Sequence, residues 1–105
     1  MSVVLDAIKE NLERNLYMQE LYFKNMQNLR KGSLTIKTIN GKEYYYLVYR
    51  EGEKVKTDYI GVKGKADLNH IKKEIKDRGN YRRQIIQLKK EEKELRRAIK
   101  ALGGN

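Results

Sequence analysis

Apolar residues recur at intervals of three and four between residues 3 and 30, which is the spacing of one face of an α-helix. The predicted stripe consists of Leu5, Ile8, Leu12, Leu16, Phe23 and Met26, with Tyr22 and Leu29 along one edge. Gly32 follows, and we expect it to end the helix in a left-handed conformation. At full length this helix would be roughly 40 Å long, which is longer than a domain of this size needs.

From Ser33 the pattern changes to alternation, which predicts strands. Asn40-Gly41 lies between two alternating runs and is a strong hairpin signal, because both turn residues must take a positive φ. A two-residue loop there pairs Ile39 with Lys42 and, farther along, Leu34 with Leu47. We therefore expect a three-stranded antiparallel sheet over residues 33–62.

The second turn of this sheet can be built in two ways. A two-residue loop would place Lys54 and Lys56 on the apolar face. A three-residue loop with Gly52 left-handed in a bulge shifts the alternation and puts Val55 there instead. Because burying two unpaired lysines costs several kcal/mol, the sequence favours the bulged turn.

Two further helices are predicted after the sheet, over residues 67–78 and 80–102, with Asp67 and Asn80 as N-caps. The second has a heptad seam with one polar member, formed by Tyr81, Ile85, Leu88, Glu92, Leu95, Ile99 and Leu102. The expected fold class is α+β, and residues 1–105 are expected to form a single domain with a long N-terminal helix, the sheet, a short helix and a long C-terminal helix.

Net charge is the part of the composition that says most about function. The net charge is +10, and the excess is concentrated in residues 31–65 and 80–105. A localised positive field attracts polyanions, of which nucleic acid is the commonest in the cytoplasm. The absence of cysteine excludes disulfides and favours a reducing cytoplasm. No apolar run is long enough to span a membrane, and the start of the chain is not typical of a signal peptide.

Tyrosines alternate with cations on one predicted face of the sheet. Tyr44 and Tyr46 face away from the core-facing Tyr45, and the cations expected beside them are Lys37, Lys42, Arg50, Lys54 and Lys56. Cations neutralise phosphates, and tyrosine rings stack on unpaired bases; a twisted sheet can alternatively enter a major groove. The structural alternative is that the first helix or a second subunit covers these rings.

The C-terminal helix repeats a basic pair every seven residues, at Arg82-Arg83, Lys89-Lys90 and Arg96-Arg97. Such a stripe could follow a phosphate backbone, and we include Arg82, Arg83, Lys89 and Lys90 among the candidate contacts. The same pattern is also typical of the solvated flank of a coiled coil.

Catalytic chemistry has little support in the sequence. His70 is the only histidine, and His70 with Glu74 one turn later would need further ligands to hold a metal. No glycine-rich phosphate loop or activated nucleophile is recognisable. We therefore expect no enzymatic activity, no cofactor and no metal.

The segment "KGSLTIKTINGKEYYYLVYREGEKVKTDYIG" resembles one that recurs in small uncharacterised proteins of phages and bacterial mobile elements, which share the GS start, the tyrosine-rich strand, the YREG-K turn and the YIG end. More loosely, it is similar to the arm-type DNA-binding domains of tyrosine recombinases and to the N-terminal regions of some transposases. The resemblance implies a contact face formed by Lys37, Tyr44, Tyr46, Arg50, Lys54 and Lys56.

The sequence thus predicts a small basic nucleic-acid-binding protein of phage or mobile-element origin, acting by occupancy as an accessory or regulatory factor on DNA or RNA. One alternative is a phage-encoded inhibitor of a host defence nuclease, comparable to an anti-CRISPR, that binds the nuclease complex or its guide RNA. Another is a coiled-coil structural or interaction protein, with a possible homodimer through the long helices.

Overall fold

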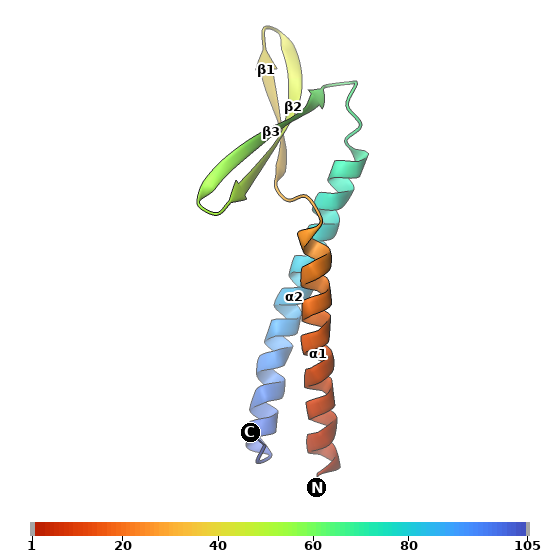
Figure 1. Ribbon diagram of the computed structural model, residues 1–105, viewed down its shortest axis with the longest axis vertical. Helices are drawn as coiled ribbons and strands as arrows, with labels where there is room; N and C mark the ends of the chain where they lie inside the picture. The colour runs from red at the N-terminus through yellow and green to blue at the C-terminus, as the bar shows by residue number, and fades with distance from the viewer. Residues whose placement is uncertain (1, 105) are drawn as a thin grey trace. The chain divides into compact units, whose positions relative to one another are not determined.

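The computed structural model describes residues 2–104 and contains five elements (Figure 1). In chain order they are α1 (Val3–Gln27), β1 (Ser33–Ile39), β2 (Lys42–Glu51), β3 (Lys54–Val62) and α2 (Asn69–Ala101). The α+β class and the order of helix, antiparallel sheet and C-terminal helix are confirmed. The described residues contain two helices, however, where the sequence predicted three.

The chain forms two compact units, which we describe separately. One, the helical hairpin, comprises residues 1–28 and 79–105, and the other, the sheet unit, comprises residues 29–78. Within the helical hairpin, α1 and the C-terminal part of α2 run antiparallel, so that the first turn of α1 and the last turn of α2 lie at the same end of this unit (Figure 1).

Helix α1 begins at a serine cap and ends earlier than predicted. The Ser2 hydroxyl accepts a hydrogen bond from the Leu5 amide at 3.1 Å, which satisfies one of the free N–H groups of the first turn. The helix ends at Gln27 with Asn28 as its C-cap, so Gly32 is not the helix stop. Gly32 instead has a φ of 119° at the entry to β1, where a Cβ would overlap the Val48 carbonyl oxygen.

The packed seam of α1 differs from the predicted stripe at its centre. Leu16 and Phe23 remain 39% and 49% exposed, whereas Asn15 is only 5% exposed. Partly or fully buried positions recur at alternating steps of three and four, at Leu5, Ile8, Leu12, Asn15, Gln19, Tyr22 and Met26, and Met18 beside this row is also partly buried. This heptad seam packs on the predicted seam of α2, where the rings of Tyr22 and Tyr81 lie 5.5 Å apart.

The polar members of the two seams bond to one another. The Asn15 amide donates to the Leu88 carbonyl oxygen at 2.9 Å, and the Gln19 amide donates to Asn15 at 2.7 Å and to Glu92 at 2.9 Å. Arg96 completes the cluster with a 2.8 Å bond to the other Glu92 oxygen. Because these partners are available at one axial alignment only, the cluster favours a single register of the two helices.

Helix α2 is continuous from Asn69 to Ala101, so the predicted break at Gly79-Asn80 is wrong. One glycine inside a helix costs only about 1 kcal/mol, and the chain has no proline to end the helix there. Asp67 lies one residue before the N-cap position, because Leu68 precedes the helix and its carbonyl accepts the first helical bond, from the Lys72 amide. The Asp67 carboxylate still accepts a hydrogen bond from the Asn69 amide at 3.0 Å. Within residues 2–104, neither helix is long and apolar enough to cross a membrane.

The sheet has the order β1-β2-β3, and both neighbouring pairs are antiparallel. In the first hairpin Ile39 pairs with Lys42 and Leu34 with Leu47, as predicted. Asn40 and Gly41 have φ values of 51° and 79°, which is the requirement of a two-residue type I′ turn. The Asn-Gly signal therefore set the register of this hairpin.

The second hairpin corrects the prediction. Glu51 pairs with Lys54 and Arg50 with Val55, so the turn contains only Gly52 and Glu53. Gly52 has the expected positive φ of 63°, but as the first residue of a two-residue turn rather than in a three-residue bulge. The bulge lies farther along, where Tyr46 pairs with Tyr59 but Tyr45 pairs with Gly61, and Ile60 is the extra residue.

Leu47 in β2 and Ile71 in α2 are the most buried apolar side chains of the sheet unit, at 4% and 6% exposure. The chain returns from β3 to α2 through a close approach, since a Cβ on Gly61 would lie 2.7 Å from the Ala66 side chain. Strand residues 54–59 are all exposed, so the end of the sheet at the second turn is not covered.

Candidate nucleic-acid interface

The register divides the strand residues between two faces, because cross-strand partners lie on the same side of a sheet and neighbours along a strand on opposite sides. One face, which we call the tyrosine face, consists of Ser33, Thr35, Lys37, Ile39, Lys42, Tyr44, Tyr46, Val48, Arg50, Val55, Thr57, Tyr59 and Val62. The other, which we call the mixed-charge face, consists of Leu34, Ile36, Thr38, Glu43, Tyr45, Leu47, Tyr49, Glu51, Lys54, Lys56 and Asp58.

Three rings form a cluster on the tyrosine face. The ring centroids of Tyr46 and Tyr59 are 5.7 Å apart and those of Tyr44 and Tyr59 are 6.1 Å apart, at tilted to edge-on angles. Tyr44 and Tyr46 are half-buried and Tyr59 is 51% exposed. The Lys37 ammonium lies 4.8 Å from the Tyr46 ring centroid, within cation–π range.

Tyr59 is a residue that the sequence interpretation missed. The assumed three-residue turn placed it on the face of Leu47, whereas the two-residue turn pairs it with Tyr46. The Gly52-Glu53 pair was the available signal, since glycine at the first central position suits a two-residue type II′ turn.

The cations of the tyrosine face have no acidic neighbours on that face. Lys37, Lys42 and Arg50 lie there, and each strand acid (Glu43, Glu51 and Asp58) is on the opposite face. Among residues 2–104, none of these three cations makes an ion pair. The face therefore presents positive charge that is not neutralised within the sheet.

The prediction that Lys54 and Lys56 share a face with Tyr44 and Tyr46 is wrong. Both belong to the mixed-charge face, and the predicted cost of placing them there does not arise because that end of the sheet is exposed. Lys56 forms an ion pair with Glu51 at 2.9 Å. The hydrogen bond raises the pKa of Lys56 and lowers the pKa of Glu51.

Other charges of the mixed-charge face are also paired. Lys63, just beyond β3, forms an ion pair with Glu43 at 2.7 Å, and the bond raises the pKa of that lysine. Two effects raise the pKa of Tyr49, namely partial burial, which is the larger, and a hydrogen bond to Asp58. This face thus neutralises much of its charge internally, in contrast to the tyrosine face.

The candidate residues Arg82, Arg83, Lys89 and Lys90 belong to the helical hairpin and are all exposed. Arg83 donates a hydrogen bond to the Asn80 side chain, whereas Arg96, one heptad after Lys89, is held by Glu92. These four residues lie on the outer surface of α2, which agrees with the description of a solvated flank.

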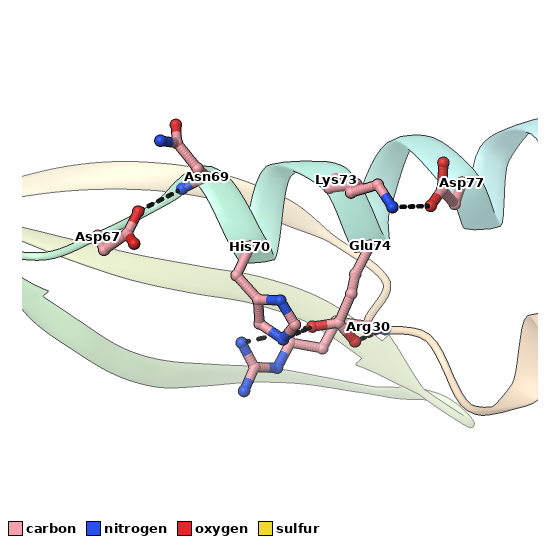
Figure 2. Close-up of polar contacts among 7 residues, drawn as sticks. All are labelled: Arg30, Asp67, Asn69, His70, Lys73, Glu74 and Asp77. Carbon is pink, nitrogen blue, oxygen red and sulfur yellow. Dashed lines mark hydrogen bonds and ion pairs between the residues drawn. The ribbon is translucent and has the colours of Figure 1, made fainter.

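His70 takes part in a structural cluster at the start of α2 (Figure 2). Its Nε2 lies 3.0 Å from the Glu74 carboxylate, which also accepts a hydrogen bond from the Arg30 amide at 3.4 Å. Arg78 adds a 3.0 Å bond to the Leu29 carbonyl oxygen. The cluster fixes the segment before β1 to α2, and no group of three metal-ligating side chains occurs within the part of the chain that the structure describes.

Neither the search of curated proteins nor the search of solved structures returned a significant match. A family model does match residues 5–70, a range that covers all but the first two residues of α1, the whole sheet and the first residues of α2. Both faces of the sheet and the whole seam of α1 therefore lie inside the matched range. On this match over more than half of its length, the chain belongs to the family described as a domain of unknown function, DUF6788.

Proposed function

We propose that the tyrosine face binds nucleic acid and that the protein acts by occupying its target, without chemistry of its own. The observation that carries the proposal is the sorting of charge across the sheet, with acids on one face and unpaired cations with tyrosines on the other. Lysine and arginine neutralise phosphates and release counterions, which makes binding strong at low salt. We propose that the protein acts in the cytoplasm, where nucleic acid is the commonest polyanion.

The aromatic cluster adds a second mode of contact. Tyr59 is the most exposed of the three rings, and a base stacked on a tyrosine contributes about 1–3 kcal/mol. Lys37 already covers part of Tyr46, so it is placed to contact a phosphate beside a base that stacks on Tyr59. This arrangement favours strands with accessible bases over fully paired duplexes.

Two double variants of identical charge change test the face directly. Lys37→Glu with Lys42→Glu alters the tyrosine face, and Lys54→Glu with Lys56→Glu alters the mixed-charge face as the matched control. We expect the first pair to weaken binding to single-stranded oligonucleotides at least about tenfold and to reduce the salt slope by roughly 1 to 2, since each lost phosphate contact removes about 0.7.

The measurement is a fluorescence-anisotropy titration of single- and double-stranded DNA and RNA at two salt concentrations, with circular dichroism to establish that each variant is folded. The control pair should change affinity much less. Equal losses in the two folded double variants would show that only net charge matters, and would remove the tyrosine face from the proposal.

A further inference from the structure

The seam of the helical hairpin is flanked on its two sides by different kinds of side chains. On one side Asn11 and Met18 of α1 and Glu91 and Ala98 of α2 line a groove of about 540 Å³. These residues lie beside the seam, on one flank of each helix. The opposite flanks of the two helices therefore meet on the other side of the hairpin. Arg96 and Lys100, which line a separate hollow with Leu12, lie on that other side.

Helix α1 carries a column of acids and apolar residues on that second side. Asp6, Glu13 and Glu20 follow one another at steps of seven residues, which keeps them aligned along the helix. Leu16 and Phe23 lie three residues after two of these acids, hence on the same flank, and both are exposed, as are Tyr17 and Leu21 on other sides of the helix.

Helix α2 carries the complementary column. Arg82, Lys89 and Arg96 also recur every seven residues, and each is followed by another basic residue. Ile86 lies among them and is 47% exposed. On this side of the hairpin, α1 therefore presents exposed apolar residues bordered by acids, and α2 presents an exposed apolar residue bordered by cations.

The two columns overlap along the hairpin. The contacts of Tyr22 with Tyr81 and of Asn15 with Leu88 would place Glu20 at Arg83, whereas the bond of Gln19 to Glu92 would place it at Glu91, so the residues that lie level are midway between these alignments. On that midpoint Glu20 lies between Arg83 and Lys90, and Glu13 lies between Lys90 and Arg97.

These opposite charges are not paired within the chain. Among the described residues, no ion pair joins an acid of α1 to a cation of α2, and Glu20 pairs instead with Lys24 on its own helix at 3.4 Å. The acids and the cations thus share a seven-residue spacing and overlap along the hairpin, yet no ion pair of the described residues joins one column to the other.

We propose that this side of the helical hairpin binds a second copy of the chain in a four-helix dimer. A twofold axis parallel to the helices sets α1 of each copy against α2 of the other at the same level, so the acidic column faces the basic column, and Leu16 and Ile86 lie on the shared face. A twofold axis across the helices would instead set α1 on α1 and repeat the acidic column against itself. Charge complementarity therefore selects the first arrangement.

Charge reversal and its rescue test this interface. Glu13→Lys with Glu20→Lys reverses α1, and Arg82→Glu with Lys89→Glu reverses α2. Because every substitution acts twice across a twofold interface, we expect each double variant to weaken dimerisation at least about tenfold. The quadruple variant, in which both columns are exchanged, should dimerise again.

The measurement is sedimentation equilibrium of full-length protein freed of nucleic acid, so it is independent of the tyrosine face. Glu91→Lys with Glu94→Lys, on the groove side, is the matched control and should leave the dimer intact. Circular dichroism establishes that each variant is helical. A monomeric wild-type protein at the highest concentration studied, or a quadruple variant as weak as the doubles, would overturn the proposal; a monomer whose α2 cations bind oligonucleotides would assign that stripe to nucleic acid.

Discussion

The helical hairpin and the sheet unit differ in where their polar side chains lie and in whether these side chains are bonded within the unit. The hairpin buries Asn15 and Gln19 in its seam and bonds them to Leu88 and Glu92 on the other helix. The sheet places Lys37, Lys42 and Arg50 on one face without an acidic partner among the described residues, and Lys37 lies over the Tyr46 ring. Buried polar groups with partners define one register of a fold, whereas unpaired surface cations leave their binding capacity for another molecule.

This difference separates residues that serve the fold from residues that serve a partner. Removing a seam residue should change stability, and removing a cation of the tyrosine face should change binding with little effect on stability. The predictions that follow examine the folding side of that contrast, beginning with the largest expected effect.

Gly32→Ala should destabilise the sheet unit by about 3 kcal/mol. The backbone there has a φ of 119°, and a Cβ would overlap the Val48 carbonyl oxygen and lie 2.9 Å from the Tyr49 Cβ. Urea denaturation followed by tyrosine fluorescence measures the loss. Gly52→Ala is the control, because Gly52 also has a positive φ but no neighbour within reach, and it should cost only about 1 kcal/mol. Similar losses at the two glycines would refute the close approach.

Asn15→Ala should destabilise the helical hairpin by about 1–2 kcal/mol. The substitution removes two hydrogen bonds of a side chain that is 5% exposed, and it leaves the Gln19 amide with one partner fewer. Thermal unfolding followed by helical circular dichroism measures the change. Asn11→Ala on the exposed surface of the same helix is the control and should be neutral or slightly stabilising. An equal response of the two variants would mean that the seam cluster contributes nothing.

Acid should weaken the helical hairpin through Glu92, with the smallest effect of the three. Hydrogen bonds from Gln19 and Arg96 hold the pKa of Glu92 below its ordinary value near 4.5. A lowered pKa in the folded state contributes stability above that ordinary value, and the contribution is lost as the pH falls toward the folded value. Glu92→Gln should therefore lose less stability than wild type between pH 6 and pH 3.

The matched control for this titration is Glu94→Gln. Glu94 lies on the same helix, and it makes no ion pair within the described range of the chain. Its acid response should follow that of wild type. Parallel stability curves for wild type and Glu92→Gln would show that the seam carboxylate is not held by its neighbours.

The fold was predictable wherever a local signal determined it. Asn40-Gly41 admits one turn, so the register of the first hairpin followed from two residues. Gly52-Glu53 admitted two turns, and the choice was made on the cost of burying Lys56, which is in fact exposed and paired with Glu51. Gly79 predicts a helix end, but a single glycine is too weak a signal to break a long helix.

The site was only partly predictable because face membership depends on distant partners. Tyr44 and Tyr46 were placed correctly by alternation in β2, whereas Tyr59 required the turn and the bulge together. In the helical hairpin, Leu16 was chosen over Asn15 because it is apolar. The preference for Asn15 comes from Leu88, which is far along the chain and cannot be identified from the periodicity of one helix.

The bulge at Ile60 also has a consequence for altering the length of the chain. Beyond it, β3 has already lost its regular alternation with β2, and Gly61 pairs with Tyr45 while Tyr59 keeps its place beside Tyr46. An insertion or deletion of one residue between Tyr59 and Gly61 would be absorbed there instead of turning the strand over. Deletion of Ile60 would therefore remove the bulge and leave the residues of both faces on their own sides of the sheet.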